Sequence, residues 1–119
     1  MSPDPEPGTP AQAAAGLVIY RFESQLFFAN AATFKNQVLD LAAGGVRWIV
    51  LDAEAVTGID TTAAQTLHEV ARALTDRKIT FAISRTTATI TGMLTHYGLE
   101  DIPLYDSNEE AARAFRTTG

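Results

Sequence analysis

The residues whose types and spacing could do chemistry lie together in one short stretch, Asp60-Thr61-Thr62, which follows a turn at Gly58. Aspartate is a preferred N-cap residue, so Asp60 is predicted to cap a helix whose first two residues are Thr61 and Thr62. Both hydroxyls and the free amides of the first helical turn would then face one solvent-accessible point, which carries partial positive charge from the helix. This helix start is therefore the first candidate for a functional site.

Two interpretations of this helix start compete. In the first, Asp60 satisfies the free amides for about 1 kcal/mol of stability, and the threonines are merely tolerated beside it. In the second, the helix start is an anion site, either for a bound ligand or for a phosphate added to Thr61 or Thr62. The carboxylate of Asp60 repels an anion that the amides attract, and this conflict suits a phosphorylation switch better than a tight binding site.

A second helix start could complete a nucleotide site. Ser84-Arg85-Thr86-Thr87 follows the next predicted strand along the chain, and Arg85 would be the nearest cation. Because the sequence contains neither the P-loop pattern nor the Gly-rich dinucleotide pattern, a nucleotide would have to bind at helix N-termini. The candidate nucleotide-binding residues are therefore Gly58, Asp60, Thr61, Thr62, Ser84, Arg85, Thr86 and Thr87.

Other chemistries find weaker support. Asp52 and Glu54 follow a predicted buried strand, as do the carboxylates of Mg²⁺-dependent phosphatases with an aspartyl nucleophile, but no later acidic pair ends a strand. His68 and His96 are far apart in the sequence and have no ligand-type partner one helical turn away. The sequence also contains no G-x-S-x-G motif of serine hydrolases. We therefore expect no catalytic residue and no metal site.

The composition narrows the class of protein further. The chain has 119 residues, 46% of them hydrophobic, and its 14 acidic and 9 basic residues give a formal net charge of −5. This length fits one domain, and the acidic balance argues against a nucleic-acid partner. The absence of Cys excludes disulfides and thiolate metal sites. Because no apolar run approaches the ~18–20 residues of a membrane span and the first residues do not resemble a signal peptide, we expect a soluble cytosolic domain.

Hydrophobic periodicity predicts alternating strands and helices between two disordered ends, residues 1–16 and 117–119. The first end, Met1–Gly16, carries all but one of the prolines and is interpreted as a tail or linker. The predicted strands are Leu17–Glu23, which forms a hairpin or a closely paired couple of strands with Leu26–Phe28, then Val46–Asp52, Lys78–Ser84 and Ile102–Tyr105. The predicted helices begin at the N-cap candidates Asn30 and Asp60, at Thr87, and at the capping box that starts with Ser107. The order β-β-α-β-α-β-α-β-α indicates an α/β fold with a mostly parallel sheet covered by helices.

Two stretches of the chain resemble a known domain family. The junction of strand, loop and helix at Asp60-Thr61-Thr62, preceded by the β-β-α-β order, is similar to the STAS domain of sulfate transporters and anti-sigma-factor antagonists. Tyr20–Ala31, with its Leu-Phe-Phe-Ala-Asn core, resembles the opening of the STAS domain of SulP-type anion permeases, and Val56–Ala64 resembles the permease version of the loop. The resemblance covers residues 17–116 and implies the STAS fold for that span.

The resemblance implies a non-catalytic, regulatory, cytosolic domain at the C-terminal end of a sulfate-type anion transporter. Implied partners are the transmembrane domain of the same permease, regulatory proteins and a GTP or ATP ligand, with no other cofactor. Thr61 matches the serine that is phosphorylated in the antagonists, and Asp60 matches the acidic residue before it. A free-standing antagonist switched at Thr61 is the alternative, but Ala63 in place of the antagonists' usual Gly, and Glu54 in place of Ser, favour the permease.

Four aromatic residues gather near the first predicted strands: Tyr20, Phe22, Phe27 and Phe28. If the first strand is a sheet edge, some of them must face outward. An exposed aromatic patch is typical of interaction surfaces, so we hypothesise that this patch docks to the membrane domain or to another partner.

Overall fold

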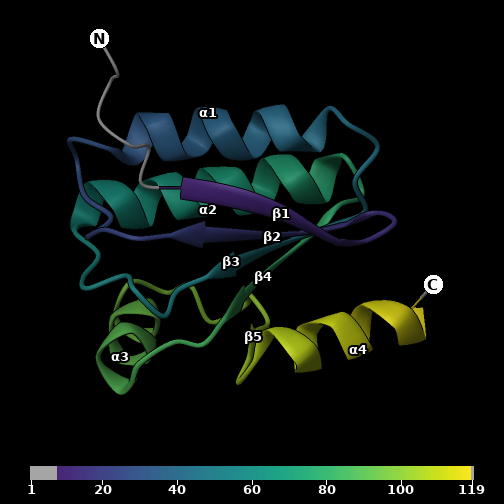
Figure 1. The fold of residues 1–119 in the computed structure, drawn as a ribbon. Coiled ribbons are helices and arrows are strands. Elements are labelled where there is room, and N and C mark those ends of the chain that lie inside the picture. The colour runs from purple at the N-terminus through teal and green to yellow at the C-terminus, as the bar shows by residue number, and fades with distance from the viewer. Residues whose placement is uncertain (1–7, 119) are drawn as a thin grey trace, which may run out of the picture.

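The computed structural model describes residues 8–118 and shows a five-stranded sheet with helices on both faces (Figure 1). The strands lie in the order β1-β2-β3-β4-β5, with β1 antiparallel to β2 and the other neighbours parallel. This arrangement confirms the predicted α/β fold with a mostly parallel sheet. The elements in chain order are β1 (Gly8–Ala14), β2 (Leu17–Phe22), α1 (Ala31–Ala42), β3 (Trp48–Asp52), α2 (Thr61–Asp76), β4 (Thr80–Ser84), α3 (Ala88–His96), β5 (Leu104–Tyr105) and α4 (Asn108–Thr118).

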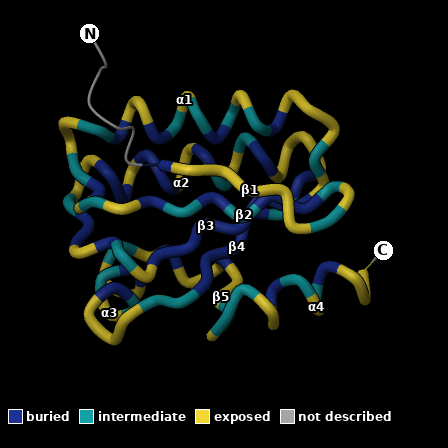
Figure 2. Tube along the Cα trace, viewed as in Figure 1, coloured by how far each residue is buried: buried dark blue, intermediate teal, exposed yellow. Residues whose placement is uncertain are grey.

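Helices α1 and α2 cover one face of the sheet, and α4 lies against the other. In β3, Ile49 and Leu51 belong to the larger core beneath α1 and α2, whereas Trp48 and Val50 pack with Phe115 of α4. Figure 2 shows the result, with β3 buried along its whole length and β1 largely exposed. The nearly continuous apolar sequence of β3 is typical of a strand buried on both faces.

Strand β1 corrects the prediction of a disordered tail over residues 1–16. Gly8–Ala14 pairs antiparallel with β2, and a short turn with Gly16 in the left-handed region (φ 89°) joins the two strands. Residues 1–7 and 119 lie outside the described part of the chain. Composition misled the prediction because a run rich in proline and small residues carries almost no apolar periodicity.

Pro10 shows how a proline can still belong to this strand. The amide of Trp48 in β3 donates to the carbonyl of Gly16, and this bond sets the alternation along β2, so that the backbone groups of Tyr20 face β3. Pro10 pairs with Tyr20, and its own backbone therefore points away from β2 toward the open edge of the sheet. At that position the missing N–H costs no ladder hydrogen bond.

Two further predictions about the strands and the chain end are wrong. Leu26–Phe28 does not pair with β2 as a hairpin, because Leu26 instead forms an isolated parallel bridge with Ile59. The predicted order β-β-α-β-α-β-α-β-α matches the structure, but its first two strands are β1 and β2. Residues 117 and 118, predicted as a tail, belong to α4.

The predicted helix starts agree with the structure to within one or two residues. The hydroxyl of Ser107 accepts a hydrogen bond from the amide of Glu110 at 3.0 Å, as a capping box requires. The carboxylate of Glu110 accepts the amide of Asp106 at 3.3 Å, one residue before the Ser107 amide that a complete capping box would use. None of the helices in the described residues is long and apolar enough to cross a membrane.

Candidate functional site

The carboxyl ends of the parallel strands meet at one edge of the sheet, which we call the rim, and ligands of open α/β sheets bind at such an edge. Two aspartates stand at the rim. Asp52 is the last residue of β3, and Asp60 directly precedes α2. Their surroundings differ, so each is described separately.

The carboxylate of Asp60 joins two loops through backbone amides. Its Oδ1 accepts the amide of Ala63 at 2.8 Å, which confirms Asp60 as the N-cap of α2. Its Oδ2 accepts the amide of Phe28 at 2.9 Å. Each carboxylate oxygen thus has one amide donor, and these donors partly compensate the negative charge that would otherwise oppose an anion at the helix start.

Backbone hydrogen bonds strengthen the same junction. The amide of Leu26 donates to the carbonyl of Gly58 at 2.9 Å, and the amide of Asp60 donates to the carbonyl of Leu26 at 3.2 Å. The two stretches that carry the family resemblance are therefore one hydrogen-bonded unit. Their sequence separation hid this contact, since no local pattern predicts a bridge between two loops.

Asn30 stabilises this unit but does not cap α1 as predicted. Its side chain makes no cap hydrogen bond to the helix. Instead, its Oδ1 accepts the amide of Phe27 at 3.0 Å, and its Nδ2 donates to the carbonyl of Gln25 at 2.8 Å. Asn30 thus closes the loop from Ser24 to Phe28 on itself.

Thr61 and Thr62 are exposed at the start of α2. Among the described residues, neither side chain has a hydrogen-bond partner. The backbone amide of Phe28 donates to the carboxylate of Asp60, and the Phe28 side chain is 71% exposed. Of the predicted aromatic patch, Phe28 is the exposed member, because Tyr20 and Phe22 are buried in the core and Phe27 is half-buried. The rim beside Asp60 presents two free hydroxyls and one exposed aromatic ring.

Asp52 has a different environment, because side chains from distant elements surround it. It is 3% exposed, and its Oδ1 accepts a hydrogen bond from Nε of Arg85 at 3.1 Å. Its Oδ2 accepts one from Nδ2 of Asn108, the first residue of α4, at 3.1 Å. Burial alone would raise the pKa of the Asp52 carboxyl, but the hydrogen bonds from Asn108, Arg85 and the Glu54 amide outweigh it and hold the pKa below its ordinary value.

Glu54 completes a charged cluster around Asp52. Its Oε1 lies 2.9 Å from Nη1 of Arg21 and 2.7 Å from Nη2 of Arg85. The hydrogen bond with Glu54 is the largest of the effects that raise the pKa of Arg21 above its usual value. Both arginines are therefore occupied by carboxylates, and Arg85 does not stand free as the cation predicted for a nucleotide.

The remaining candidate nucleotide-binding residues also have partners. Ser84 is buried and donates to Asn108. Thr86 accepts a hydrogen bond from the Thr91 hydroxyl at 2.9 Å, and Thr87 caps α3 by accepting the amide of Ile90 at 3.2 Å. Across residues 8–118, no hydrogen bond or ion pair joins residues 58–62 to residues 84–87. The structure brings both stretches to the rim without connecting them.

Sequence reasoning missed the roles of Arg21 and Asn108. It favoured Asp52 as a structural residue at a strand end over a phosphatase nucleophile, but it named no partner for this carboxylate. The available signal was the position of Asp52 at the end of a buried strand, where a carboxylate needs donors. Its partners come from β2, from the end of β4 and from α4, which are far apart in the chain. In the described residues, no group of three or more His, Cys, Asp or Glu side chains could hold a metal ion.

Comparison with known proteins identifies the family of the chain. A family model described as STAS domain matches residues 9–112. Two probable sulfate transporters of Mycobacterium tuberculosis, from the strains CDC 1551 and H37Rv, are each 40% identical to the chain over 78 residues. The match covers 63% of this chain and 14% of each transporter, so the chain spans a small part of the length of these relatives.

Solved structures of both anti-sigma factor antagonists and transporter STAS domains have the same fold as this chain. An anti-sigma factor antagonist from Mycobacterium paratuberculosis has a TM-score of 0.80 at 17% identity, with 97% of each chain covered. The STAS domain of a SulP transporter from Vibrio cholerae has a TM-score of 0.74 at 25% identity, with 90% of this chain and 86% of that chain covered. The STAS resemblance derived from the two sequence stretches is confirmed.

Proposed function

The chain belongs to the STAS domain family, and on that premise we propose that it is the non-catalytic regulatory domain of a sulfate-type anion transporter. The observation that carries the proposal is the 40% identity over 78 residues to two probable sulfate transporters. In this proposal the domain lies on the cytoplasmic side of the membrane, and its main partner is the transmembrane domain of the same polypeptide.

The alternative is a free-standing anti-sigma-factor antagonist, which the shared fold equally permits. Two positions support the transporter. Glu54 stands where antagonists often carry Ser, and here it binds both Arg21 and Arg85. Ala63 stands where antagonists usually carry Gly, and here it is buried at the start of α2.

We assign the regulatory contact to the rim beside Asp60. The hydroxyls of Thr61 and Thr62 are exposed, and the positive end of α2 favours a phosphate placed there. Phe28 offers a partner an apolar contact next to the same point. Phosphorylation of Thr61 would add about −1.5 to −2 charges beside this ring and change how a partner docks.

A nucleotide is the second ligand proposed for the rim. GTP or ATP would place its phosphates at the start of α2, near Gly58 and Thr61, with the start of α3 as a second contact. Because Arg85 is held by Asp52 and Glu54, binding is expected to be weak. NMR spectra recorded with millimolar GTP or ATP should show amide shifts at residues 58–62 and 84–88, and unchanged spectra would contradict nucleotide binding.

The transporter proposal is tested on the complete protein that contains this chain. The full reading frame should encode membrane spans, and its expression in a bacterial strain deficient in sulfate uptake should restore uptake of labelled sulfate. Removal of residues 8–118 should lower uptake per transporter molecule in the membrane, which immunodetection on purified membranes would quantify. A reading frame without membrane spans would contradict the proposal and favour the antagonist.

A further inference from the structure

The edge of β4 beside β5 is open over half its length. β5 pairs with Ile83 and Ser84 alone, whereas β3 pairs with all five residues of β4. Thr80–Ala82 therefore have a neighbouring strand on the β3 side but, in residues 8–118, none on the β5 side. An unpaired edge of this kind is a template for another strand.

Backbone hydrogen bonds identify the groups that face this open edge. The amide of Thr80 donates to Arg47 on the β3 side, and the amide of Ile83 donates to Pro103 on the β5 side. Since backbone groups alternate between the two sides of a strand, the N–H and C=O of Phe81 point to the β5 side. The next residue placed to donate to the Phe81 carbonyl is Pro103, which has no N–H, and the ladder ends there.

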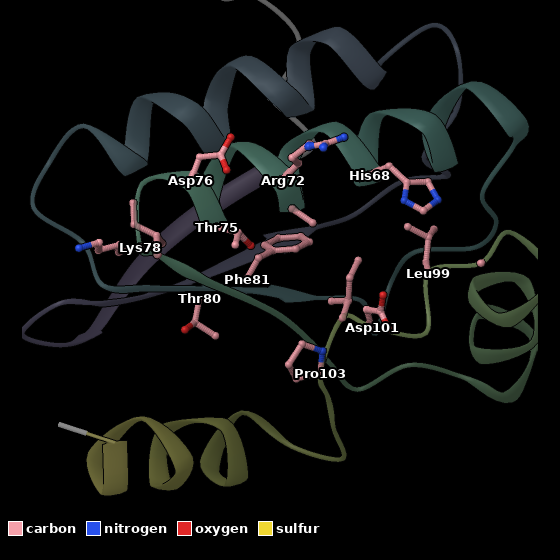
Figure 3. A pocket seen from close by; sticks show the side chains of 14 residues that line it. His68, Arg72, Thr75, Asp76, Lys78, Thr80, Phe81, Leu99, Asp101 and Pro103 are labelled. Atoms are coloured by element: carbon pink, nitrogen blue, oxygen red, sulfur yellow. The ribbon is translucent and has the colours of Figure 1, made fainter.

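A groove of about 600 Å³ lies along this open edge, between the second half of α2 and the loop that leads into β5 (Figure 3). Apolar side chains, including Ala71, Leu99 and Ile102, contribute to its lining, and the side chain of Phe81 points toward α2. Its volume falls within the usual range of binding pockets, about 300–1,000 Å³. The charged residues around it carry both signs, and the described chain forms no salt bridge with them: Arg72, Asp76, Lys78 and Asp101.

We propose that this groove binds an extended peptide segment of another polypeptide, which adds to β4 as a short strand in line with β5. One N–H and one C=O of the peptide would pair with the free C=O and N–H of Phe81. The peptide residue opposite Phe81 shares its face of the sheet, so its side chain points toward α2 and should be apolar. The residues on either side point to the opposite face and should be polar.

The β1 edge of the sheet is less suited to the addition of a peptide strand. β1 turns the backbone of Pro10 outward, so the middle of that edge presents a carbonyl without an N–H. The strand itself is exposed from Thr9 to Ala13. The free backbone groups of Phe81 and the adjoining groove therefore select the β4 edge, and they specify an extended backbone as its occupant. This inference is independent of the transporter assignment.

The test uses the described domain in the complete 119-residue chain and a defined probe. The probe is the acetylated and amidated pentapeptide Lys-Thr-Val-Thr-Glu, whose central Val would face α2. Two analogues carry N-methyl groups, one on the Val amide and the other on both Thr amides. Because alternate amides face β4, one analogue should lose binding and the other should keep it, and the identity of the losing analogue reports the strand direction.

Binding is followed by NMR. The unmodified peptide should shift the amides of residues 79–83 and 98–103 and slow hydrogen exchange of the Phe81 amide by about tenfold, the effect of one added hydrogen bond. Thr75→Trp fills the groove and should abolish these changes. Gln65→Trp places the same ring on an exposed position of α2 outside the groove and should preserve them.

Four results would overturn the proposal. The Phe81 amide would already be protected from exchange without peptide, or millimolar peptide would leave residues 79–83 unshifted. Alternatively, both N-methylated analogues would bind as well as the parent peptide, so that side chains rather than backbone groups drive binding. Finally, shifts confined to residues 8–14 would place the peptide at β1 instead.

Discussion

Asp52 and Asp60 lie at the same rim of the sheet, but their carboxylates have different hydrogen-bond donors. Asp52 is buried and accepts hydrogen bonds from the side chains of Arg85 and Asn108, whereas Asp60 accepts them from the backbone amides of Ala63 and Phe28. The first arrangement fastens distant elements, and above all α4, to the sheet. The second orders two loops and leaves Thr61 exposed. Two aspartates at one edge of the sheet thus have different roles: Asp52 stabilises the packing of distant elements, and Asp60 holds two loops so that Thr61 stays accessible.

Removal of the Asp52 side chain should have the largest effect. Asp52→Ala leaves Nε of Arg85 and Nδ2 of Asn108 without their acceptor, so the free energy of unfolding should fall by about 2–3 kcal/mol in urea denaturation. The matched control is Glu54→Ala, at an exposed member of the same cluster, which should cost less than about 1 kcal/mol. Equal losses for both variants would show that Asp52 is no more than a surface partner.

Asp60→Ala should have a smaller effect, since backbone amides at the rim can bind water instead. The loss of the α2 cap and of the Phe28 contact should lower the free energy of unfolding by about 1–2 kcal/mol. Asp60→Asn keeps a good capping residue, but its single Oδ1 can accept only one of the amides of Ala63 and Phe28, so its loss should be smaller than that of Asp60→Ala. Hydrogen exchange of the Phe28 and Ala63 amides should accelerate in Asp60→Ala, and unchanged exchange would contradict the double role of this carboxylate.

The lowered pKa of Asp52 makes its contribution to the unfolding free energy depend on pH. Because this pKa lies below its ordinary value of 3.8, the unfolded state takes up the proton first as the pH falls. The stabilisation is therefore complete at neutral pH, declines as the pH approaches 3.8, and is lost below the folded-state pKa. Wild-type protein and Asp52→Asn should differ in unfolding free energy at pH 7, and this difference should shrink as the pH falls below 3.8. A constant difference would show that the charge of Asp52 does not matter.

Thr61→Glu should have the smallest effect on stability. Its side chain is exposed, and the favourable interaction of a negative charge with the start of α2 is offset by repulsion from Asp60. The unfolding free energy should change by less than about 0.5 kcal/mol, a value that urea denaturation can bound. A loss of more than 1.5 kcal/mol would mean that Thr61 is a structural residue rather than an accessible one.

Local patterns were sufficient to predict the helices and the buried strands. The cap at Asp60, the box opened by Ser107 and the apolar run of β3 each depend on neighbouring residues, and the structure agrees with all three. β1 could not be predicted in the same way, because its exposed small residues and Pro10 acquire their strand conformation from pairing with β2. Tertiary pairing overrode a composition typical of disorder.

For the candidate site, local sequence patterns predicted the residues that are adjacent in the chain but not the contacts between distant ones. Asp60 and Thr61 are adjacent in sequence, and their arrangement at a helix start follows from capping alone. The cluster around Asp52 joins residues more than 30 positions apart, such as Arg21 and Arg85, and a single sequence contains no signal for such contacts. The contact between Leu26 and Gly58 likewise required the folded chain.

The central claim, that the start of α2 is a control point distinct from the structural cluster, is tested most directly by sulfate uptake of the complete transporter carrying Thr61→Glu. The control variant is Gln65→Glu, which adds the same charge one turn further along the exposed surface of α2. We predict that Thr61→Glu changes the uptake rate per transporter at unchanged unfolding free energy of the domain, while Gln65→Glu leaves the rate unchanged. Identical uptake by wild type and Thr61→Glu would contradict the claim.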